Sequence, residues 1–492
     1  MIDRRLFLTG LLAGLSTPAW AEGIARSPRP VLRGDRVPGA APAAAAPQSI
    51  AALIAAAKLG GSVGCVVVDA TTGAVLEAHE PQVQLPPASV AKAITALYAL
   101  EKLGPDYRFV TRVLATGPVQ GGIVQGDLVL VGGGDPTLQT DQLGALVAQL
   151  AQAGLKGVTG RLLLWDRALP RLDTITDDQP VHVGYDPALS GLNLNFNRVH
   201  FEWKKAGADW AVSMDARGER FVPAVAGITG KVAKRDTPVF TYKQTAQTEE
   251  WTVASAALGK GGSRWLPVRR PALYLGEVFR VMARAQGITL PAGQVVEALP
   301  SGQELGRSTS EPLTKVLRDM LRFSTNITAE CCGLTASRAS GLAGSGKAMS
   351  DWAGSRLGIN AKFTDHSGLG AGSRVTAAEM AKALLAAHRA GMELKPILRD
   401  MGMRDDSGKV IDNHPVKVLA KSGTLNFVSG LAGHIVPPGG RELIFAIFTG
   451  DPARRDAVPV AQREGPEGVS SWTKRSRRLQ GQLINRWAGL YA

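Results

Sequence analysis

A serine lies three residues before a lysine in the segment Ser89-Val90-Ala91-Lys92. The prolines Pro86-Pro87 precede this segment and an apolar stretch follows it, so we predict that a helix begins here. Residues three apart share one face of a helix, where a lysine amine can reach a serine hydroxyl. Such an amine can remove the proton that serine loses when it attacks a carbonyl carbon. The spacing indicates a nucleophile, Ser89, and its base, Lys92, although a capping serine and a surface lysine would leave the same pattern.

Lys92 has to be neutral in order to accept a proton. A free lysine has a pKa of ~10.4, whereas an effective base at neutral pH has a pKa near ~7. The difference corresponds to about 4 kcal/mol. Burial supplies part of this shift and a second cation nearby supplies more. We expect Lys421 to be that cation.

The segment Ser324-Thr325-Asn326 lies at the end of a predicted helix. We expect the Ser324 hydroxyl to relay a proton between Lys92 and a leaving amine. The Asn326 amide has a donor and an acceptor, so it can hold both Lys92 and a substrate carbonyl. The same three residue types are also common helix caps.

The segment Lys421-Ser422-Gly423-Thr424 follows a run typical of a strand. We expect Gly423 to let a substrate lie close to the backbone. Lys421 and the hydroxyls of Ser422 and Thr424 are expected to bind a terminal carboxylate. The backbone N–H groups of Ser89 and Thr424 are expected to form an oxyanion hole, in which each donor contributes about 3–4 kcal/mol. An edge strand with a solvated lysine is the alternative.

Other patterns explain fewer residues. Asp365-His366 could belong to a Ser-His-Asp site. Gly341 to Lys347 nearly matches a nucleotide-binding loop, but Ala348 stands where a Mg²⁺-binding hydroxyl is needed, so we interpret the segment as an ordinary loop. The seven histidines and three cysteines show no H-E-x-x-H or C-x-x-C spacing. The chemistry predicted for the serine requires no metal and no organic cofactor.

In this order, the three segments resemble the catalytic motifs of low-molecular-mass class C penicillin-binding proteins, the D-alanyl-D-alanine carboxypeptidase/endopeptidase family. Further resemblances lie at residues 126–128, 134–138, 192–195, 365–369 and 374–376. The match covers nearly all of the mature chain. It implies a periplasmic hydrolase that acts on peptidoglycan peptides, at the D-Ala-D-Ala bond or at the D-Ala–diaminopimelate cross-link. It also implies that β-lactam antibiotics acylate and inhibit the protein.

The chain departs from that family at three places. The usual K-T-G reads K-S-G, which keeps a hydroxyl at Ser422. His366 replaces a usual glycine. Gly370-Ala371 stand where the family commonly has Ser-Arg. In the family that arginine helps to hold the diaminopimelate end of the substrate, so its loss bears on the side-chain preference and on endopeptidase activity.

The elements around these motifs predict an α/β (α+β) fold. Runs at 61–70 and 74–80, and at 428–436 and 442–449, are typical of hairpin strands. Together with the resemblance, they predict an antiparallel sheet flanked by helices, the transpeptidase-like domain of penicillin-binding proteins and serine β-lactamases. We assign residues 49–103 and 303–492 to this DD-peptidase domain. Residues 104–302 are far too many for a connection, so we predict one or two small β-rich domains inserted there.

The two ends of the chain bear on its location. Residues 1–21 have the charge, apolar run and A-x-A site of a signal peptide. Arg4-Arg5 fit a twin-arginine (Tat) or an ordinary Sec signal equally well. Residues 22–48 are predicted to be an extended leader. No later stretch is apolar for the length of a membrane span, so we expect a periplasmic protein that contacts membrane at most peripherally. The predicted helix 472–490 is expected to pack on the sheet, with a membrane-surface helix as the alternative.

The composition narrows the partners further. The net charge is +14 and aromatic residues make up 5%, with no basic run interleaved with aromatics. These features do not favour nucleic-acid binding. We expect Cys65, Cys331 and Cys332 to be buried free thiols, and a bridge from Cys65 to one of the pair is the alternative.

Two other functions remain open on the sequence. A β-lactamase-like hydrolase would use the same residues, but it would turn penicillin over within seconds. A basic, non-catalytic wall-binding protein would form no covalent adduct with penicillin. The oligomeric state, and the balance between carboxypeptidase and endopeptidase activity, do not follow from the sequence.

Overall fold

The computed structural model describes residues 48–492, except 246–247, 393 and 406. The predicted signal peptide, residues 1–21, lies outside the described residues. The same holds for all but the last residue of the predicted leader. Within the described part of the chain, no helix is both long enough and apolar enough to cross a membrane.

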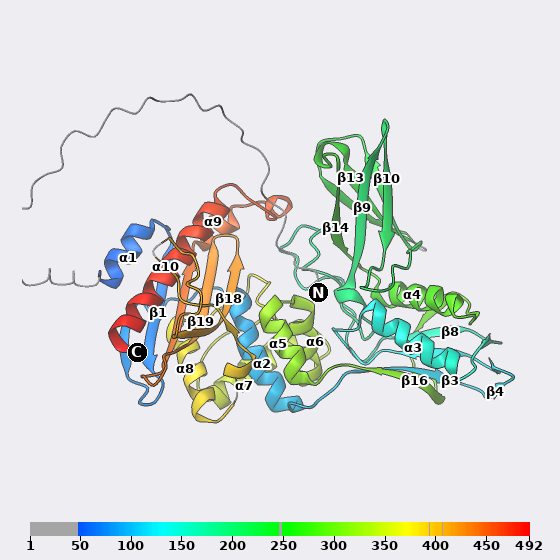
Figure 1. The fold of residues 1–492 in the computed structure, drawn as a ribbon, viewed down its shortest axis with the longest axis horizontal. Helices are drawn as coiled ribbons and strands as arrows, with labels where there is room; N and C mark the ends of the chain where they lie inside the picture. Colours follow the sequence, from blue (N-terminus) through cyan, green and yellow to red (C-terminus); the bar gives the residue numbers. More distant parts are fainter. Residues whose placement is uncertain (1–47, 246–247, 393, 406) are drawn as a thin grey trace, which may run out of the picture. The chain divides into compact units, whose positions relative to one another are not determined.

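A six-stranded antiparallel sheet joins the first and last parts of the described chain, with the strand order β17-β18-β19-β20-β1-β2 (Figure 1). The strands are β1 (Ser62–Asp69), β2 (Val75–His79), β17 (Arg399–Asp400), β18 (Lys417–Leu425), β19 (Val428–Val436) and β20 (Leu443–Gly450). Nearly every residue of β1, β19 and β20 is buried. The sheet is therefore covered on both faces. Both predicted hairpins, β1–β2 and β19–β20, are confirmed.

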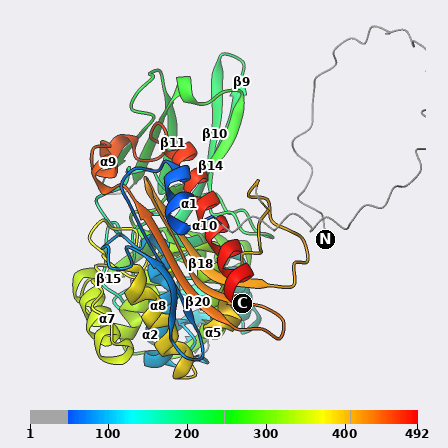
Figure 2. The same ribbon diagram turned by 90° about the vertical axis from the view of Figure 1, so that its left-hand side faces the viewer.

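Helices α1 (Ile50–Ala57) and α10 (Val469–Tyr491) pack on one face of this sheet (Figure 2). The buried positions Trp472, Leu479 and Leu483 recur along α10 at helical spacing. They join the core formed with the inward side chains of the strands. The expected packing of the terminal helix on the sheet is confirmed, and its apolar side is not available to a membrane surface.

Five helices cover the other face or pack against its core: α2 (Ala91–Leu103), α5 (Leu313–Phe323), α6 (Asn326–Ser337), α7 (Leu342–Leu357) and α8 (Ala377–Arg389). Thr376 and Glu379 form the reciprocal hydrogen bonds of a capping box at the start of α8. α2 lies in the middle of this layer and every residue from Ala91 to Ala99 is buried. The helix that carries the predicted base is therefore buried at the centre of this layer.

One prediction about this layer is wrong. The segment Gly341 to Lys347 is not a loop, because α7 begins at Leu342. The glycines of this segment made a loop the simpler prediction. Gly346 is nevertheless required inside the helix, where α7 packs closely against another segment. A Cβ atom at Gly346 would lie 2.7 Å from the backbone carbon of Thr364.

The segment between α2 and α5 contains four further sheets. The largest has the order β15-β8-β6-β3-β16. Its strands are β3 (Val110–Ala115), β6 (Leu128–Val131), β8 (Leu162–Trp165), β15 (Gly293–Val296) and β16 (Gln303–Thr309). Two three-stranded sheets, β10-β9-β14 and β11-β13-β12, follow between β8 and β15 along the chain. Their strands are β9 (Arg198–Ala206), β10 (Asp209–Asp215), β11 (Ile228–Ala233), β12 (Phe240–Gln244), β13 (Glu249–Ala254) and β14 (Gly261–Pro267). The last sheet is β4 (Val119–Gln120), β5 (Ile123–Val124) and β7 (Gly157–Val158).

The segment is rich in strands, as expected, but it also contains two helices that were not predicted. They are α3 (Thr140–Gln152) and α4 (Pro271–Ala285), which pack on the five-stranded sheet. Leu143, Leu146, Val147 and Leu150 are the buried side of α3. Their helical spacing was the signal available in the sequence.

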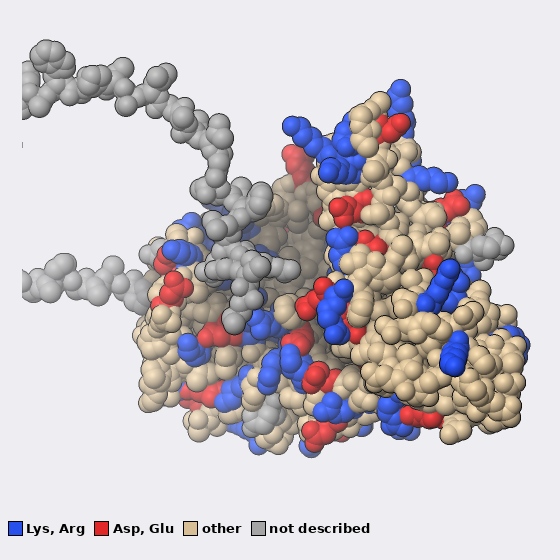
Figure 3. Space-filling model, turned by 45° about the vertical axis from the view of Figure 1, so that its right-hand side comes forward, with Lys and Arg blue, Asp and Glu red and all other residues tan. Residues whose placement is uncertain are grey.

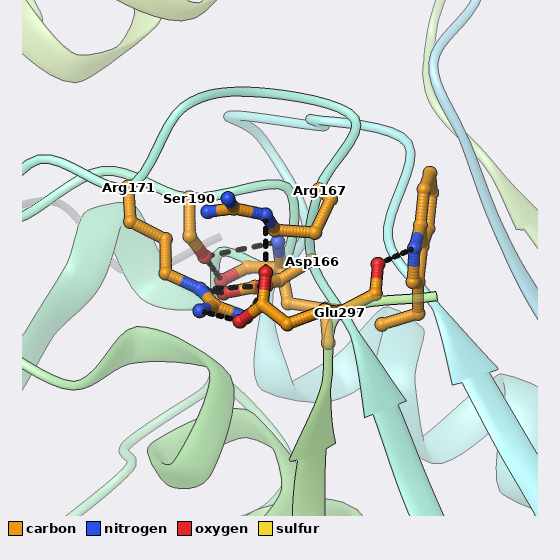
Figure 4. Close-up of polar contacts among 7 residues, drawn as sticks. Asp166, Arg167, Arg171, Ser190 and Glu297 are labelled. Atoms are coloured by element: carbon orange, nitrogen blue, oxygen red, sulfur yellow. Dashed lines mark hydrogen bonds and ion pairs between the residues drawn. The ribbon is translucent and has the colours of Figure 1, made fainter. Parts of the chain in front are cut away.

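An ion-pair cluster lies at the end of two neighbouring parallel strands in this segment (Figure 4). Asp166 follows β8 and Glu297 follows β15. Arg171 bridges the two carboxylates, with nitrogen–oxygen distances of 2.7 Å to Asp166 and 2.6 Å to Glu297. Arg167 contacts Glu297 at 2.9 Å. Because carboxyl ends of parallel strands meet at one edge, the two acids are close neighbours and require the arginines between them.

The three cysteines, Cys65, Cys331 and Cys332, are buried free thiols. The expectation of free thiols is confirmed, and the alternative bridge from Cys65 is not formed. Burial raises the pKa of the Cys65 thiol to about 12. Such a thiol is not a reactive nucleophile at neutral pH.

Candidate active site

Ser89 lies in a short 3₁₀ helix, Ala88–Val90, that runs directly into α2. Ala88 has a φ of 46°, in the left-handed region that residues other than glycine rarely adopt. Gly368 lies against this turn, and a Cβ atom there would sit 1.9 Å from the Ala88 carbonyl oxygen. The tight turn presents Ser89 to Lys92, whose Nζ lies 2.9 Å from Ser89 Oγ. The predicted nucleophile and base are therefore in contact.

Lys92 is completely buried, and two more oxygens surround its amine. Nζ lies 2.8 Å from Asn326 Oδ1 and 2.8 Å from the backbone carbonyl oxygen of Ser367. These two oxygens can only accept hydrogen bonds. A neutral amine has two N–H groups and a lone pair. It can donate to both carbonyl oxygens and direct its lone pair at the Ser89 hydroxyl.

The environment favours the neutral amine. Burial lowers the pKa of Lys92 to about 7, against the opposing effect of the carboxyl groups of Glu330 and Asp365. Burial, and then the charge of Lys92, lower the pKa of Lys421. Two ammonium groups in one dry site repel each other, so protonation of one disfavours protonation of the other. The lowered pKa that a base requires is present, and burial causes it, whereas the expected contribution of Lys421 is not found.

Two buried acids lie beneath Lys92. They are Glu330 on α6 and Asp365 between α7 and α8, and each accepts hydrogen bonds from two backbone N–H groups of the loop 366–370. Burial raises the pKa of both carboxyl groups, that of Glu330 to about 8. Because they hold this loop, they also fix the Ser367 carbonyl oxygen that contacts Lys92. Glu330 was not predicted, and Asp365 was considered only for a Ser-His-Asp site and within the family resemblance, since the function of each appears only when the loop folds over α6.

His366 does not form a Ser-His-Asp site. Its ring is fully buried, and Nε2 lies 2.6 Å from Ser345 Oγ on α7. Burial lowers the pKa of His366 to about 3. Gly333 makes space for the ring, because a Cβ atom there would lie 2.1 Å from it. The histidine is thus a neutral core residue in this chain.

The segment Ser324-Thr325-Asn326 separates α5 from α6. Ser324 adopts the left-handed conformation, with a φ of 59°, which stops α5 and turns the chain into α6. The Ser324 hydroxyl accepts a hydrogen bond of 3.0 Å from Lys421. Among the described residues its partner is this lysine and not Lys92. Asn326 contacts Lys92 as expected, but its amide nitrogen donates to the Tyr185 carbonyl oxygen at 2.8 Å.

Lys421 and Gly423 lie on β18, on the side of the strand that meets the Ser89 turn. Lys421 is almost completely buried. A Cβ atom at Gly423 would lie 2.7 Å from the backbone nitrogen of Ser89. From the sequence, we predicted that this glycine lets a substrate lie close to the backbone. The structure gives another reason for it, because here the Ser89 turn itself occupies the space.

A cavity of about 380 Å³ opens above Ser89, with Ser324, Asn326 and Thr424 in its wall. Ser422 is not part of this wall and lines a neighbouring groove instead. Tyr185 and Arg455 also line the cavity, and neither was predicted from the sequence. Arg455 is 2% exposed, and one of its terminal nitrogens has no hydrogen-bond partner among the described residues.

The unusual pair Gly370-Ala371 lies beside another cation. The backbone N–H of Ala371 donates to Asp178 at 2.9 Å, and Arg463 pairs with the same carboxylate at 3.2 Å. Arg463 follows the short helix α9 (Pro452–Asp456) and lines the cavity. A guanidinium group is therefore present near this edge of the site, although it comes from a different segment than in the resembling family.

The sequence profile of the D-Ala-D-Ala carboxypeptidase 3 (S13) family matches residues 46–472. The chain belongs to this family. Its members include the low-molecular-mass class C penicillin-binding proteins, so the resemblance seen in the three motifs is confirmed. The roles of Ser89, Lys92, Ser324 and Lys421 in this chain stay predictions.

Two relatives and one solved structure each match most of the length of this chain. A D-alanyl-D-alanine carboxypeptidase of Actinomadura sp. is 30% identical over 475 residues, which cover 86% of each protein. A carboxypeptidase of Mycobacterium tuberculosis is 28% identical over 452 residues, covering 85% of this chain and 83% of the relative. The crystal structure of penicillin-binding protein 4 from Haemophilus influenzae superposes with a TM-score of 0.71 at 20% identity. That match covers 90% of this chain and 99% of the other, and it confirms the predicted fold class.

Over residues 48–492, apart from the few positions not described, no group of three or more His, Cys, Asp or Glu side chains is arranged to hold a metal ion. The polar groups in the cavity wall are hydroxyls, three side-chain amides, the cations Arg455 and Arg463 and the carboxylate of Glu464, which is paired with Arg264. This set suits a substrate with carbonyl and carboxylate groups.

Proposed function

We propose that this protein is an exported serine-type D-Ala-D-Ala carboxypeptidase that cleaves peptidoglycan stem peptides through an acyl-enzyme on Ser89. The contact between Ser89 and the buried amine of Lys92 carries the proposal. Its 2.9 Å distance allows direct proton transfer. The pKa of Lys92, lowered to about 7, leaves much of the amine neutral at physiological pH.

In the first step Ser89 Oγ attacks the carbonyl carbon of the penultimate D-Ala while its proton passes to Lys92 Nζ. The backbone N–H groups of Ser89 and Thr424 stabilise the oxyanion. The C–N bond then breaks, and the proton held by Lys92 passes through the Ser324 hydroxyl to the leaving amine, which returns Lys92 to its neutral form. Lys421 supports this transfer because it donates a hydrogen bond to that hydroxyl.

In the second step water attacks the ester, with Lys92 again as base, and the shortened peptide leaves. The leaving group of the first step carries a carboxylate, which Lys421, Ser422 and Thr424 bind. Asn326 aligns the peptide once its amide releases the Tyr185 carbonyl oxygen. The same steps cleave a cross-link when the leaving amine belongs to a second stem peptide, so we include endopeptidase activity in the proposal.

β-Lactams fit the same scheme as substrates that acylate Ser89 and leave slowly. The predicted signal peptide, residues 1–21, supports action in the periplasm, where the substrate lies.

The test is a digest of purified muropeptides by the wild-type protein and by Ser89→Ala. We expect free D-Ala from pentapeptides, and monomers from cross-linked dimers, with the wild type alone. Release of D-Ala by Ser89→Ala would refute the proposed nucleophile. A parallel incubation with benzylpenicillin separates the related activities, because a peptidase keeps the adduct whereas a β-lactamase-like enzyme loses it within seconds.

A further inference from the structure

A second groove begins at the catalytic strand, on the side of the sheet covered by α10. Its volume is about 680 Å³, and Ser422 of β18 lies in its wall. Segments from β17, the loop after it, β19 and α10 complete the lining. The basic residues that line it are Arg399, Arg404, Lys474, Arg475, Arg477 and Arg478. No acidic residue is among the described residues of its wall.

The groove adjoins the proposed carboxylate site. A guanidinium nitrogen of Arg477 lies 3.3 Å from Thr424 Oγ1. The short strand β17 pairs with β18 only at Leu419 and Ala420. Beyond that point, no described strand pairs with this edge of β18. A ligand that passes Ser422 and Thr424 therefore meets the basic side chains directly.

Three of these cations have no neutralising partner in the described part of the chain. No hydrogen bond or ion pair of the side chains of Lys474, Arg475 or Arg478 occurs among the described residues. Arg475 Nε is buried without a partner among the described residues, and so is Oδ1 of Asn485, which also lines the groove. Elsewhere the charges are mixed, as in Figure 3, where basic and acidic side chains are interspersed over much of the face that is drawn. The groove thus carries a local excess of positive charge that a bound anion would balance.

We propose that this groove binds the leaving half of a cross-linked substrate, an acidic peptide with carboxylates beyond the one next to the scissile bond. This inference rests on the proposed function. In that reaction the acyl part of the substrate occupies the cavity above Ser89, and the carboxylate of the leaving residue lies at Ser422 and Thr424. Any chain attached to the leaving residue continues past these two side chains. The basic groove is what it meets there.

The consequence is a preference between two substrates of the same site. A single D-Ala ends at Ser422 and Thr424, so the cations farther along the groove contribute little to its release. A leaving peptide with further carboxylates gains electrostatic attraction along the groove, which favours both encounter and binding. The groove therefore favours cleavage of cross-links over trimming of terminal residues.

The test compares two substrates in one variant. The triple variant Lys474→Gln/Arg475→Gln/Arg478→Gln removes three cations of α10 and leaves Arg477, which contacts Thr424, in place. We expect its kcat/KM for a cross-linked dimer to fall by about tenfold, chiefly through KM. We expect kcat/KM for release of terminal D-Ala to stay within about twofold of the wild-type value. Added salt should weaken wild-type cleavage of the dimer more than that of the monomer.

A matched control removes the same charge elsewhere. Lys204, Lys243 and Lys260 are exposed residues of the segment between α2 and α5, and their replacement by Gln should leave both rates unchanged. An equal fall for both substrates, or no fall for the dimer, would overturn the inference. So would normal cleavage of dimers by the α10 variant together with lost binding to polyphosphate or to anionic vesicles, because another anion would then be the occupant. Failure of the wild type to release D-Ala or to form a penicillin adduct would instead refute the proposed function.

Discussion

The cations at the candidate active site and those at the Asp166 cluster have opposite surroundings. Arg171 lies between two carboxylates, and its hydrogen bonds to Asp166 raise the pKa of the guanidinium group. Lys92 is buried among a hydroxyl and two carbonyl oxygens, and burial lowers the pKa of its amine to about 7. One arrangement keeps a permanent charge and the other removes it. The difference separates a cation that stabilises the fold from one that can exchange a proton.

The acids near Lys92 sharpen this contrast. Glu330 and Asp365 are close enough to influence the amine, but their carboxylates accept hydrogen bonds from the backbone of the loop 366–370. They do not form an ion pair with Lys92 among the described residues. Their burial raises the pKa of both carboxyl groups, which keeps them from holding the lysine in its charged form.

The largest expected effect is on the chemistry of the lysine. Lys92→Met removes the base and should lower the rate of acylation by benzylpenicillin by about 10⁴-fold. The melting temperature should stay the same or rise, because a buried amine is replaced by an apolar side chain of similar length. Stopped-flow acylation and thermal unfolding measure the two quantities. Acylation at more than a tenth of the wild-type rate would show that Lys92 is not the base.

The corresponding change in the Asp166 cluster should have the reverse outcome. Arg171→Met leaves the buried carboxylate of Asp166 without its cation, so the free energy of unfolding should fall by about 2–3 kcal/mol. This loss of stability is small for a broken buried ion pair, because the Arg171 side chain is 35% exposed. Acylation of the folded variant should stay within about threefold of the wild-type rate. Arg167→Met is the control, since its pair with Glu297 is solvent-exposed on both sides and contributes less than about 1 kcal/mol.

The pH dependence of acylation follows from the lowered pKa of Lys92. Above about pH 7 the amine is neutral and can accept the Ser89 proton. Below that pH it is protonated, so the second-order rate constant should fall by about tenfold between pH 8 and pH 6. Glu330, Asp365 and Lys421 are the other ionisable groups around it. A rate that is level across this range would mean that Lys92 does not titrate near neutrality.

The smallest expected effect on stability is that of an exposed ion pair, which is neither part of a buried cluster nor close to the active site. Lys347 and Asp351 lie four residues apart on α7 and are mostly exposed. Lys347→Gln should change the free energy of unfolding by less than about 0.5 kcal/mol and should leave acylation unaltered. Urea unfolding of the variant and the wild type provides the measurement. A change above about 1 kcal/mol would mean that the strength of an ion pair in this protein does not follow its burial.

Local patterns in the sequence were sufficient for much of the fold and for the reacting groups. Ser89 and Lys92 are three residues apart, so a single helical turn fixes their contact. The hairpins and the capping box at Thr376 are also set by neighbours in the sequence. In contrast, α3 and α7 were missed because glycines and turn residues nearby obscured their apolar spacing. Packing against other segments decided those helices.

The rest of the candidate site depends on distant segments. Tyr185, Glu330 and Arg455 reach the site only after folding, and no short spacing marks any of them. The requirement for glycine at position 423 also depends on a distant segment. A side chain there would collide with the Ser89 turn, which lies against β18 only in the folded protein. Motifs identify groups that can react. The burial that tunes the pKa of those groups is a property of the whole fold.

The central claim is that the hydroxyl of Ser89, activated by the Lys92 amine, is the nucleophile. Intact-mass analysis after incubation with benzylpenicillin, followed by peptide mapping, tests it most directly. We expect one penicilloyl group on the wild type, attached to Ser89, and none on Ser89→Ala. An adduct of the same mass on Ser89→Ala, or on another residue of the wild type, would contradict the account.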